Sequence, residues 1–495
     1  MTARALMLQG TGSDVGKSVL TAGLVRLARR RGYAVAPFKP QNMSNNAAAC
    51  ADGGEIGRAQ ALQALAAGLE PQVDFNPVLL KPQSDNRSQI VVHGRAVSTA
   101  AASDYIANRG ALLGPVLQSF ERLCNAYDLV IVEGAGSPAE INLRRGDIAN
   151  MGFARAAQVP VCLVADIERG GVIASLVGTR AVLAPEDAAM IRGFIVNKFR
   201  GDPRLFDSGV DAIVAHTGWR AFGVIPWLEE VRLLPAEDAV SLDRDGERRT
   251  DTLRIAAPML SRMANFDDAD PLRQQPGVSF EWVPPGRPLP RDCDVVILFG
   301  TKSTLAELSF LREQGWDHDL LAHARSGGRV LGICGGYQLL GRHIHDPDGV
   351  DGPPGSVEGL GLLDVETTMA PAKTVRPTSG ECAHSGTAVA GYEIHVGETS
   401  GPDCTRPMFL IDDHREGAAS LSGRVTGTYV HGVFGNDSYR SQWLTRAGAK
   451  QLSPFDYSAA VESALDALAD AIAAAVDVDA LLSTARRPQD RSSSG

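Results

Sequence analysis

Three features are missing from this sequence, and each absence excludes a class of protein. The seven cysteines include no Cys-x-x-Cys pair and no regular spacing, which argues against a zinc site, a dithiol redox motif or a disulfide framework. There is no excess of positive charge, since 58 Asp and Glu outnumber 48 Lys and Arg and the net charge is -10. Non-specific nucleic-acid binding, which needs a basic face, is therefore not expected.

Long apolar runs are missing as well. The runs at 128–133 and 294–300 have the length of a strand and are well short of a membrane span. The short apolar stretch at 5–8 leads directly into a Gly-rich loop, so the N-terminus does not read as a cleavable signal. We find no repeat of fixed period. These observations predict a cytoplasmic protein with no membrane partner, and they leave the formation of a homo-oligomer open.

The chain of 495 residues is too long for one hydrophobic core, so two domains are expected. In the first half, short apolar strands alternate with amphipathic or Ala-rich helical stretches, which predicts a doubly wound parallel sheet covered by helices on both faces. The expected strands are 5–9, 34–38, 128–133, 160–166, 193–199 and 222–227. The expected helices are 16–31, 54–69, 103–126 and 205–216.

A polar, charge-rich stretch at 234–252 has the composition of a linker, after which a second α/β pattern begins. Its expected strands are 253–259, 278–283, 294–300 and 329–335, its expected helices are 304–314 and 317–326, and 360–430 is β-rich. The sequence thus predicts an α/β protein with one domain at 1–233, a linker at 234–252, a second domain at 253–450, and a C-terminal helix with a disordered tail at 451–495.

A phosphate-binding loop, QGTGSDVGKS, follows the first expected strand and opens the first expected helix. The common pattern has Gly six residues before the Lys, where this chain has Thr11 between two glycines. Backbone N–H groups near Gly12 and Gly16 would still surround phosphate oxygens, Lys17 would neutralise their charge, and Ser18 would bind Mg²⁺. The loop therefore predicts an ATP site that uses Mg²⁺.

Two acidic residues end later strands of the same expected sheet. Glu133 and Asp166 would lie at its carboxyl edge, where such sheets bind ligands, and both are candidate Mg²⁺ ligands. Asn197 ends a further strand and is a candidate contact for adenine. The alternative for Asp166 and Asn197 is that each only shapes the following turn.

A polar segment, KPQNMSNNAAA at 39–49, follows the second expected strand. So many polar side chains disfavour both helix and strand, and either a plain polar loop or a binding surface accounts for them. Together with two cations further on, the segment would suit a substrate with many carboxylates. The candidate substrate-binding residues are Lys39, Gln41, Asn42, Ser44, Asn45, Lys81 and Arg87.

A second motif, GICGG, has the strand–turn–helix form of a nucleophile elbow with Cys334 at its centre. The start of a helix stabilises a thiolate, and the N–H groups of Gly335 and Gly300 are candidate donors to an oxyanion. His431, in TYVHG, is the candidate base. A buried, inert cysteine is the alternative reading. Both motifs in one chain suggest that ammonia made at one site is attached to an ATP-activated carboxylate at the other.

The residues at these two motifs resemble those of two enzyme classes. The loop is similar to the dethiobiotin-synthetase-like branch of P-loop proteins, and the second half resembles class I glutamine amidotransferases. Those amidotransferases usually carry Glu two residues after the catalytic His, where this chain has Val433. The resemblance therefore implies either a Cys–His dyad or an orienting acid from elsewhere in the chain.

A more specific resemblance comes from motifs that occur in order along nearly the whole chain up to about 450. They include GTGSDVGKS, KPQNMSNNA, VEGAGSPAEINL, GFIVNKFRGD, GICGGYQLLG and GTYVHGVF. The set resembles the cobyric acid synthase family of cobalamin biosynthesis. That resemblance implies ATP- and glutamine-dependent amidation of the b, d, e and g carboxylates of adenosylcobyrinic acid a,c-diamide, through an acyl phosphate.

Three other readings remain at this point. A cobyrinic acid a,c-diamide synthase, or another P-loop amidoligase with a fused glutaminase, shares both motifs, although KPQNMSNNA argues against the former. A murein-type lipid amidating ligase pairs a similar amidotransferase with a different ligase. A partition-type ATPase accounts for the loop and leaves Cys334 and His431 without a role.

Overall fold

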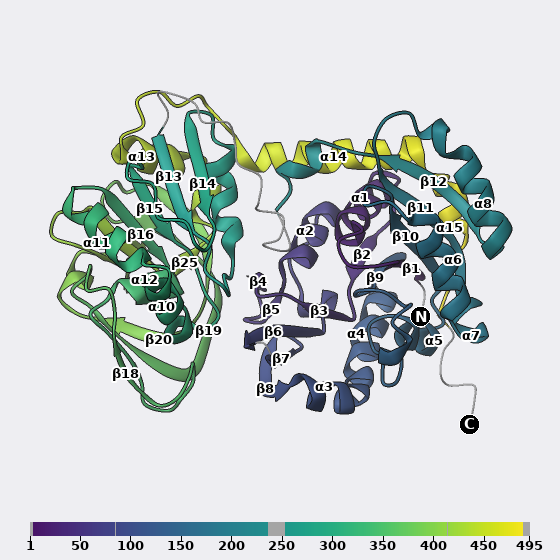
Figure 1. Ribbon diagram of the computed structural model, residues 1–495, viewed down its shortest axis with the longest axis horizontal. Helices are drawn as coiled ribbons and strands as arrows, with labels where there is room; N and C mark the ends of the chain where they lie inside the picture. The colour runs from purple at the N-terminus through teal and green to yellow at the C-terminus, as the bar shows by residue number, and fades with distance from the viewer. Residues whose placement is uncertain (1–2, 85, 236–252, 413, 489–495) are drawn as a thin grey trace. The chain divides into compact units, whose positions relative to one another are not determined.

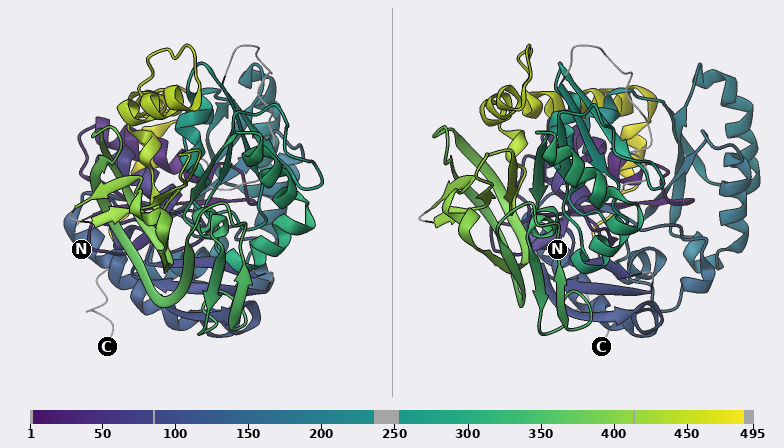
Figure 2. Two further views of the ribbon diagram at one scale, coloured as in Figure 1. Left: turned by 90° about the vertical axis from the view of Figure 1, so that its left-hand side faces the viewer. Right: turned by 60° about the vertical axis from the view of Figure 1, so that its left-hand side comes forward.

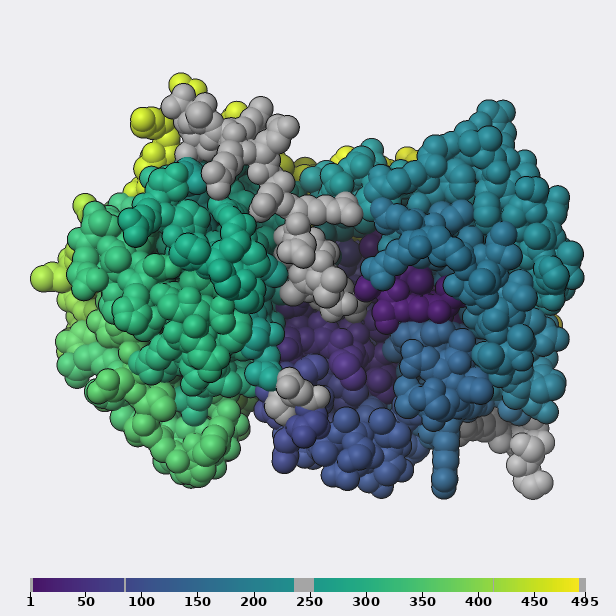
Figure 3. All heavy atoms as spheres, in the orientation of Figure 1, coloured from purple at the N-terminus to yellow at the C-terminus, as the bar shows by residue number. Residues whose placement is uncertain are grey.

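The computed structural model describes residues 3–84, 86–235, 253–412 and 414–488, and the remaining residues are grey in Figures 1, 2 and 3. Contacts divide the chain into two compact units. The first unit comprises Met1–Ser44, Glu55–Pro235 and Val461–Gly495, and the second comprises Asn45–Gly54 and Ala236–Ala460. Most of the expected linker, 236–252, and the end of the expected tail, 489–495, lie outside the described residues.

The first unit contains a six-stranded parallel sheet in the order β12-β11-β10-β1-β9-β2. The strands are β1 (Arg4–Gly10), β2 (Val35–Phe38), β9 (Leu129–Glu133), β10 (Val161–Asp166), β11 (Ile191–Phe199) and β12 (Arg220–Pro226). Their apolar residues are buried on both faces, as expected for parallel strands covered by helices. The predicted doubly wound α/β fold is confirmed, with β1 between β9 and β10 where the strand order reverses.

Helices cover this sheet and close its core. They are α1 (Lys17–Arg30), α2 (Arg58–Ala67), α3 (Ala102–Asn108), α4 (Leu113–Ala126), α5 (Met151–Ala157), α6 (Val172–Val182), α7 (Pro185–Ala188), α8 (Asp207–Thr217) and α15 (Val478–Ser483). The expected helix at 103–126 is two helices, α3 and α4, with a short 3-10 turn between them. Phe38, Phe120 and Phe153 meet in the core with ring centroids 5.1–5.5 Å apart.

A small second sheet in the first unit was not expected from the sequence. Its order is β3-β6-β7-β8, built from β3 (Gln41–Met43), β6 (Val78–Ser84), β7 (Arg87–Val92) and β8 (Arg95–Ala101). β3 therefore corrects the expectation that 39–49 lacks regular structure. It pairs with β6 in parallel, and this ladder provides the partners that its polar sequence does not suggest. Glu55–Gly57 (β5) is likewise extended at the start of the expected helix 54–69.

The last helices return to the first unit. From Val461 onward, α14 (Tyr457–Ala475) packs against α1, where a Cβ added at Gly23 would lie 2.7 Å from Leu468 Cγ. Arg26 of α1 binds Asp466 at 2.8 Å and Glu462 at 2.7 Å. Ala5 then exchanges backbone hydrogen bonds with Arg486. The C-terminal segment is thus part of the first unit's core and was expected only as a helix with a tail.

The second unit is built on a sheet in the order β14-β13-β15-β16-β24-β23, of which only the β23 edge is antiparallel. Its strands are β13 (Leu253–Pro258), β14 (Val278–Val283), β15 (Val295–Leu298), β16 (Arg329–Ile333), β23 (Ala418–Ala419) and β24 (Val425–Thr428). The helices are α9 (Asp270–Gln274), α10 (Thr304–Glu313), α11 (Trp316–Arg325), α12 (Gly335–Leu340) and α13 (Asp437–Ala447). The strands and helices expected between 253 and 335 are confirmed.

The β-rich region forms a further sheet of seven strands. Its members are β17 (His343–Asp346), β18 (Gly355–Glu358), β19 (Glu366–Cys382), β20 (Ala388–Ser400), β21 (Phe409–Ile411), β22 (His414–Glu416) and β25 (Val430–His431). The second unit also holds β4 (Ala47–Ala49), which lies against β19 and β20. Within the described residues, no helix is both long and apolar enough to cross a membrane.

Candidate functional site

The phosphate loop joins β1 to α1 at the carboxyl edge of the first unit's sheet. Gly16, before α1, has a φ of 94°, a left-handed conformation that glycine adopts without steric cost. Lys17 Nζ donates to the carbonyl of Gly12 at 2.8 Å, so the lysine folds back over the loop. The residues predicted to surround the phosphates thus form one compact loop at a helix start, which favours anions.

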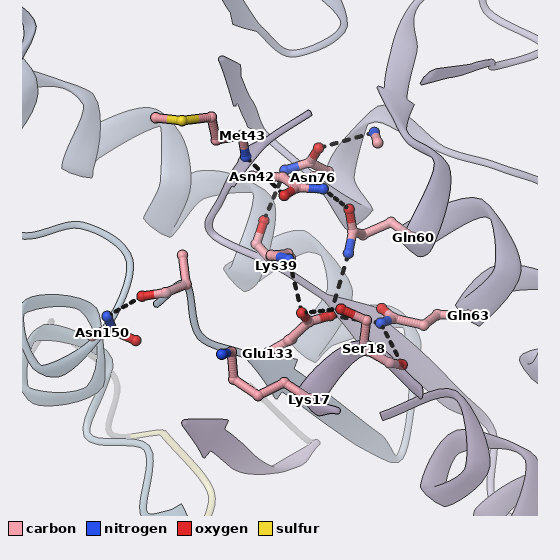
Figure 4. A network of polar contacts seen from close by, with 12 residues as sticks. Lys17, Ser18, Lys39, Asn42, Met43, Gln60, Gln63, Asn76, Glu133 and Asn150 are labelled. Atoms are coloured by element: carbon pink, nitrogen blue, oxygen red, sulfur yellow. Dashed lines mark hydrogen bonds and ion pairs between the residues drawn. The ribbon is translucent and has the colours of Figure 1, made fainter. Parts of the chain in front are cut away.

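A buried carboxylate, Glu133, lies beside this loop and collects several donors. Ser18 Oγ donates to Glu133 Oε1 at 2.7 Å, and Lys39 Nζ binds the same oxygen at 2.8 Å (Figure 4). Gln63 Nε2 donates to the other oxygen at 2.6 Å. Glu133 is fully buried, so these donors replace the water that a charged carboxylate needs. The carboxyl ends of β1, β2 and β9 therefore converge on one acidic residue.

The other predicted residues of this edge brace the loop. Asn197 Nδ2 donates to the carbonyl of Val15 at 2.9 Å, and a Cβ on Gly16 would lie 2.4 Å from that nitrogen. Asp166 binds Lys198 Nζ at 2.9 Å. Lys198 also donates to the Asp14 carbonyl at 2.5 Å. A contact of Asn197 with adenine stays a prediction, whereas its contact with the phosphate loop is direct.

The oxygen donors suit Mg²⁺ only in part. Ser18 and Glu133 lie together, whereas Asp166 is occupied by Lys198. No group of three or more His, Cys, Asp or Glu side chains that would hold a metal occurs among the residues that the structure describes. This arrangement fits an ion that takes most of its ligands from water and bound phosphates, as Mg²⁺ does with nucleotides.

Several of the predicted substrate residues make contacts inside the first unit. Asn42 Nδ2 donates to Gln60 Oε1 at 2.9 Å, and Gln60 in turn contacts Glu133 at 3.4 Å, so Asn42 joins the same network as Lys39. Gln41 accepts a hydrogen bond from Tyr105 at 2.6 Å. The backbone N–H of Ser44 donates to the Leu80 carbonyl at 3.0 Å, in line with the β3–β6 ladder.

Lys81, Arg87 and Asn45 complete the predicted substrate set. Lys81 is buried and binds Glu55 at 2.9 Å, which makes it an internal ion pair. Arg87 is exposed on β7. Asn45 belongs to the second unit. Two further cations near this edge, Lys198 and Arg200, are paired with carboxylates, Lys198 with Asp166 and Arg200 with Glu168 at 2.7 Å.

In the second unit, Cys334 stands between β16 and α12 in a strained turn. Its φ of 54° and ψ of -113° are unusual for any residue other than glycine. A Cβ at Gly332 would lie 2.6 Å from the Gly336 carbonyl, and one at Gly336 would lie 2.0 Å from the Leu298 carbonyl. These glycines let strand and helix approach closely, so the turn has the geometry of the predicted nucleophile elbow.

His431 is buried beside Cys334 and is oriented by Asp268. Its Nδ1 lies 2.7 Å from Asp268 Oδ2, and the other carboxylate oxygen accepts the Gly432 N–H at 2.6 Å. Burial lowers the pKa of His431, but the charge and hydrogen bond of Asp268, with further interactions with Cys334, outweigh it and raise the pKa to about 10. The ring therefore carries a proton near neutral pH.

Asp268 was not predicted from the sequence. Position 433, where the amidotransferase pattern has an acid, is a buried valine, and the orienting carboxylate comes from 163 residues earlier in the chain. The signal was the acidic stretch NFDDAD after the first strand of the second domain, since strand ends of an α/β sheet collect site residues. The dyad alternative therefore gives way to an orienting acid from elsewhere.

The two candidate oxyanion donors lie next to these groups. A Cβ on Gly300 would come within 3.2 Å of His431 Cε1, and one on Gly335 would come within 3.0 Å of the Thr301 nitrogen. Tyr392 stacks on the His431 ring, with centroids 5.3 Å apart and planes 18° apart. That Gly300 and Gly335 donate N–H groups to an oxyanion stays a prediction. The structure shows only that both glycines lie beside Cys334 and His431.

Two family models match this chain. The CobQ/CobB/MinD/ParA nucleotide binding domain matches residues 6–242, and the CobB/CobQ-like glutamine amidotransferase domain matches residues 254–439. A nucleotide-binding domain fused to a glutamine amidotransferase domain defines a glutamine-hydrolysing amidating ligase.

Full-length relatives narrow this class. The cobyric acid synthase of Hyphomonas neptunium is 62% identical over 99% of this chain and 99% of its own. That of Cereibacter sphaeroides is 62% identical and that of Paracoccus denitrificans 61%, each over 97% of this chain and 100% of its own. The chain belongs to the cobyric acid synthase family.

Proposed function

We propose that this protein converts adenosylcobyrinic acid a,c-diamide to adenosylcobyric acid by amidating its b, d, e and g carboxylates, with one ATP and one glutamine for each amide. The observation that carries the proposal is the buried Cys334–His431–Asp268 cluster in the same chain as a Lys17 phosphate loop. The sequence similarity to cobyric acid synthases supports the corrinoid as acceptor.

Ammonia would be released at Cys334. The thiolate attacks the side-chain amide carbon of glutamine, and N–H groups at Gly300 and Gly335 stabilise the oxyanion. His431 Nε2, the nitrogen that does not face Asp268, gives its proton to the departing ammonia. Water, deprotonated by the same nitrogen, then cleaves the thioester, so that glutamate leaves and the thiol is restored.

The acceptor carboxylate would be activated in the first unit. A carboxylate oxygen attacks the γ-phosphorus of ATP, and ADP leaves with the electron pair of the broken P–O bond. Lys17 and the loop N–H groups stabilise the charge on the phosphates. Ser18 and Glu133 would hold Mg²⁺, which supplies further neutralisation when bound. Ammonia then attacks the carbonyl carbon of the acyl phosphate. Inorganic phosphate departs, and the amide is the product.

Acceptor binding is assigned to the polar segment at 39–44, with Arg87. Lys39 and Asn42 reach Glu133 directly or through Gln60, next to where the γ-phosphate would lie. Asn42→Ala should raise KM for the corrinoid several-fold, with KM for glutamine unchanged and partly amidated intermediates accumulating. An increase confined to KM for ATP would assign the segment to the nucleotide site instead.

The test of the function is an assay of purified protein with ATP, glutamine and either cobyrinic acid or its a,c-diamide. We expect the a,c-diamide to gain four amides, resolved by mass spectrometry, with matching release of ADP and glutamate. Amidation of cobyrinic acid at a and c alone would identify an a,c-diamide synthase. ATP hydrolysis without glutamate release would support the partition-type ATPase.

A further inference from the structure

A short segment from the first half of the sequence belongs to the second unit. The chain leaves the first unit after Ser44 and re-enters it at Glu55, and the ten residues between them, Asn45–Gly54, pack with the amidotransferase fold. We call these residues the inserted segment. An inserted segment this short adds little core, so its polar contacts indicate what it does there.

The contacts centre on a pair of asparagines. Asn46, 1% exposed, accepts the backbone N–H of Asn265 through Oδ1 at 2.7 Å. Asn265 Oδ1 in turn accepts the N–H of Ala47 at 3.0 Å. Asn46 thus binds the backbone of Asn265, and Asn265 binds the backbone of Ala47, the residue after Asn46. Both asparagines are buried, where a hydrogen bond left unmade is costly.

Asn265 starts the turn that carries the orienting acid of the glutaminase. It is left-handed, with φ of 54° and ψ of 39°, and it precedes the 3-10 turn Phe266–Ala269 that contains Asp268. Asparagine tolerates this conformation better than most residues, and the hydrogen bond from its backbone N–H to Asn46 stabilises it. The same turn is tied to Gly300 through the Ala264 N–H at 2.8 Å.

A second contact leads from Asn265 to the catalytic histidine. Its Nδ2 donates to the Tyr392 hydroxyl at 3.2 Å, and the Tyr392 ring stacks on His431. Asn265 is therefore linked to His431 in two ways: through the turn to the carboxylate on Nδ1, and through Tyr392 to the ring face.

We infer that Asn46 is a positioning residue for the glutaminase reaction, acting through Asn265 to hold Asp268 and Tyr392 against His431. The inference rests on the proposed glutaminase role of Cys334 and His431. It places a determinant of glutamine hydrolysis in the sequence of the ligase half, next to the polar segment that contacts Glu133.

The inference is tested by steady-state glutamate release and by synthesis with glutamine or ammonium in the full-length protein. Asn46→Ala should lower kcat for glutamine hydrolysis roughly 3- to 10-fold, the equivalent of one hydrogen bond, with KM for glutamine unchanged. Synthesis with ammonium should be unaffected. Asn46→Asp keeps the acceptor oxygen and should restore most of kcat. Asp52→Ala, in the exposed turn of the same segment, is the matched control and should behave as wild type.

Acting through Asp268 has a further consequence. In an Asp268→Asn background the Asn46→Ala change should lower kcat less than it does in the wild type, because one of the two groups that it positions is already altered. Additive losses, a change in KM alone, equal losses with both nitrogen sources, or no loss would each overturn the inference. Cys334→Ala distinguishes failure of the proposed function from failure of the inference about Asn46. If Cys334→Ala retains glutaminase activity, the proposed function is wrong. If Cys334→Ala loses that activity and only the Asn46 results differ from expectation, the proposed function stands and the inference is wrong.

Discussion

At the scale of single residues, His431 is subject to two opposing influences, burial and the Asp268 carboxylate. Asp268→Asn removes the charge that raises the pKa of His431 and leaves burial, which lowers it. We expect glutaminase kcat to fall roughly 100-fold or more, in line with the loss of an acid that orients a catalytic histidine. Synthesis with ammonium should be retained in the same variant, and its loss would indicate misfolding instead.

The same pair predicts a pH dependence. The pKa of about 10 in the folded protein lies above the ordinary 6.5. Protonated His431 therefore stabilises the fold fully below about pH 6.5, and this contribution is lost as the pH rises through 10. Wild type should lose stability against urea between these pH values more than Asp268→Asn does. Parallel stability curves for the two proteins would contradict the assignment.

Lys17 belongs to the other half of the reaction. Lys17→Ala should abolish synthesis with both glutamine and ammonium, because carboxylate activation precedes attack by nitrogen and the loss of phosphate stabilisation costs several kcal/mol of the barrier. Glutamate release without ATP should persist, since Cys334 and His431 are unchanged. The measurement is synthesis and glutaminase in parallel, and ammonium-driven turnover in this variant would refute the role.

Residues at motifs were predictable because their chemistry is local. Lys17 and Cys334 lie in short patterns whose backbone geometry follows from the glycines beside them. Asp268 was not, because its partner is 163 residues away and only the fold brings them together. Lys81 was predicted to bind substrate, but its ammonium group is paired with buried Glu55. No sequence pattern indicates this ion pair, because the fold brings the two residues together.

At the scale of elements, the turn between β16 and α12 determines whether Cys334 is presented. A Cβ at Gly336 would lie 2.0 Å from the carbonyl of Leu298 in β15. Gly336→Ala must therefore push α12 away from β15. We expect loss of glutamine-driven synthesis, retention of the ammonium-driven reaction, and a cost of about 1–3 kcal/mol in stability. Gly355→Ala, where an added Cβ meets nothing within 4 Å, is the control. Equal glutaminase activity in both variants would argue against the elbow.

The strands of the first unit's main sheet, and β13 to β16 of the second, were predictable because buried parallel strands are continuous apolar runs with glycine or polar boundaries. β3 was not, because Gln41–Met43 has no strand propensity of its own and is extended through its pairing with β6. In such short elements, pairing with a neighbouring strand outweighs the intrinsic conformational preference of the residues.

At the scale of the whole molecule, α14 provides the first unit with part of its core. Leu468 is buried against Gly23 of α1, so Leu468→Ala should leave a cavity and cost about 2–5 kcal/mol. ATP-dependent synthesis should then be lost on heating before glutamate release is. Asp470→Ala, with a side chain 65% exposed on the same helix, should match wild type. Simultaneous loss of both activities in the Leu468 variant would contradict the prediction that α14 stabilises the first unit in particular.

The return of the chain to the first unit sets a constraint on its synthesis. The ribosome completes β1, α1 and the rest of the first sheet early, but the residues that cover α1 and pair with Ala5 are made only after those of the second unit. The second unit contains the inserted segment, which is translated about two hundred residues before β13. During translation the α1 surface of the first unit therefore stays uncovered until 461–486 emerges, and exposed apolar surface of this kind favours aggregation or chaperone binding.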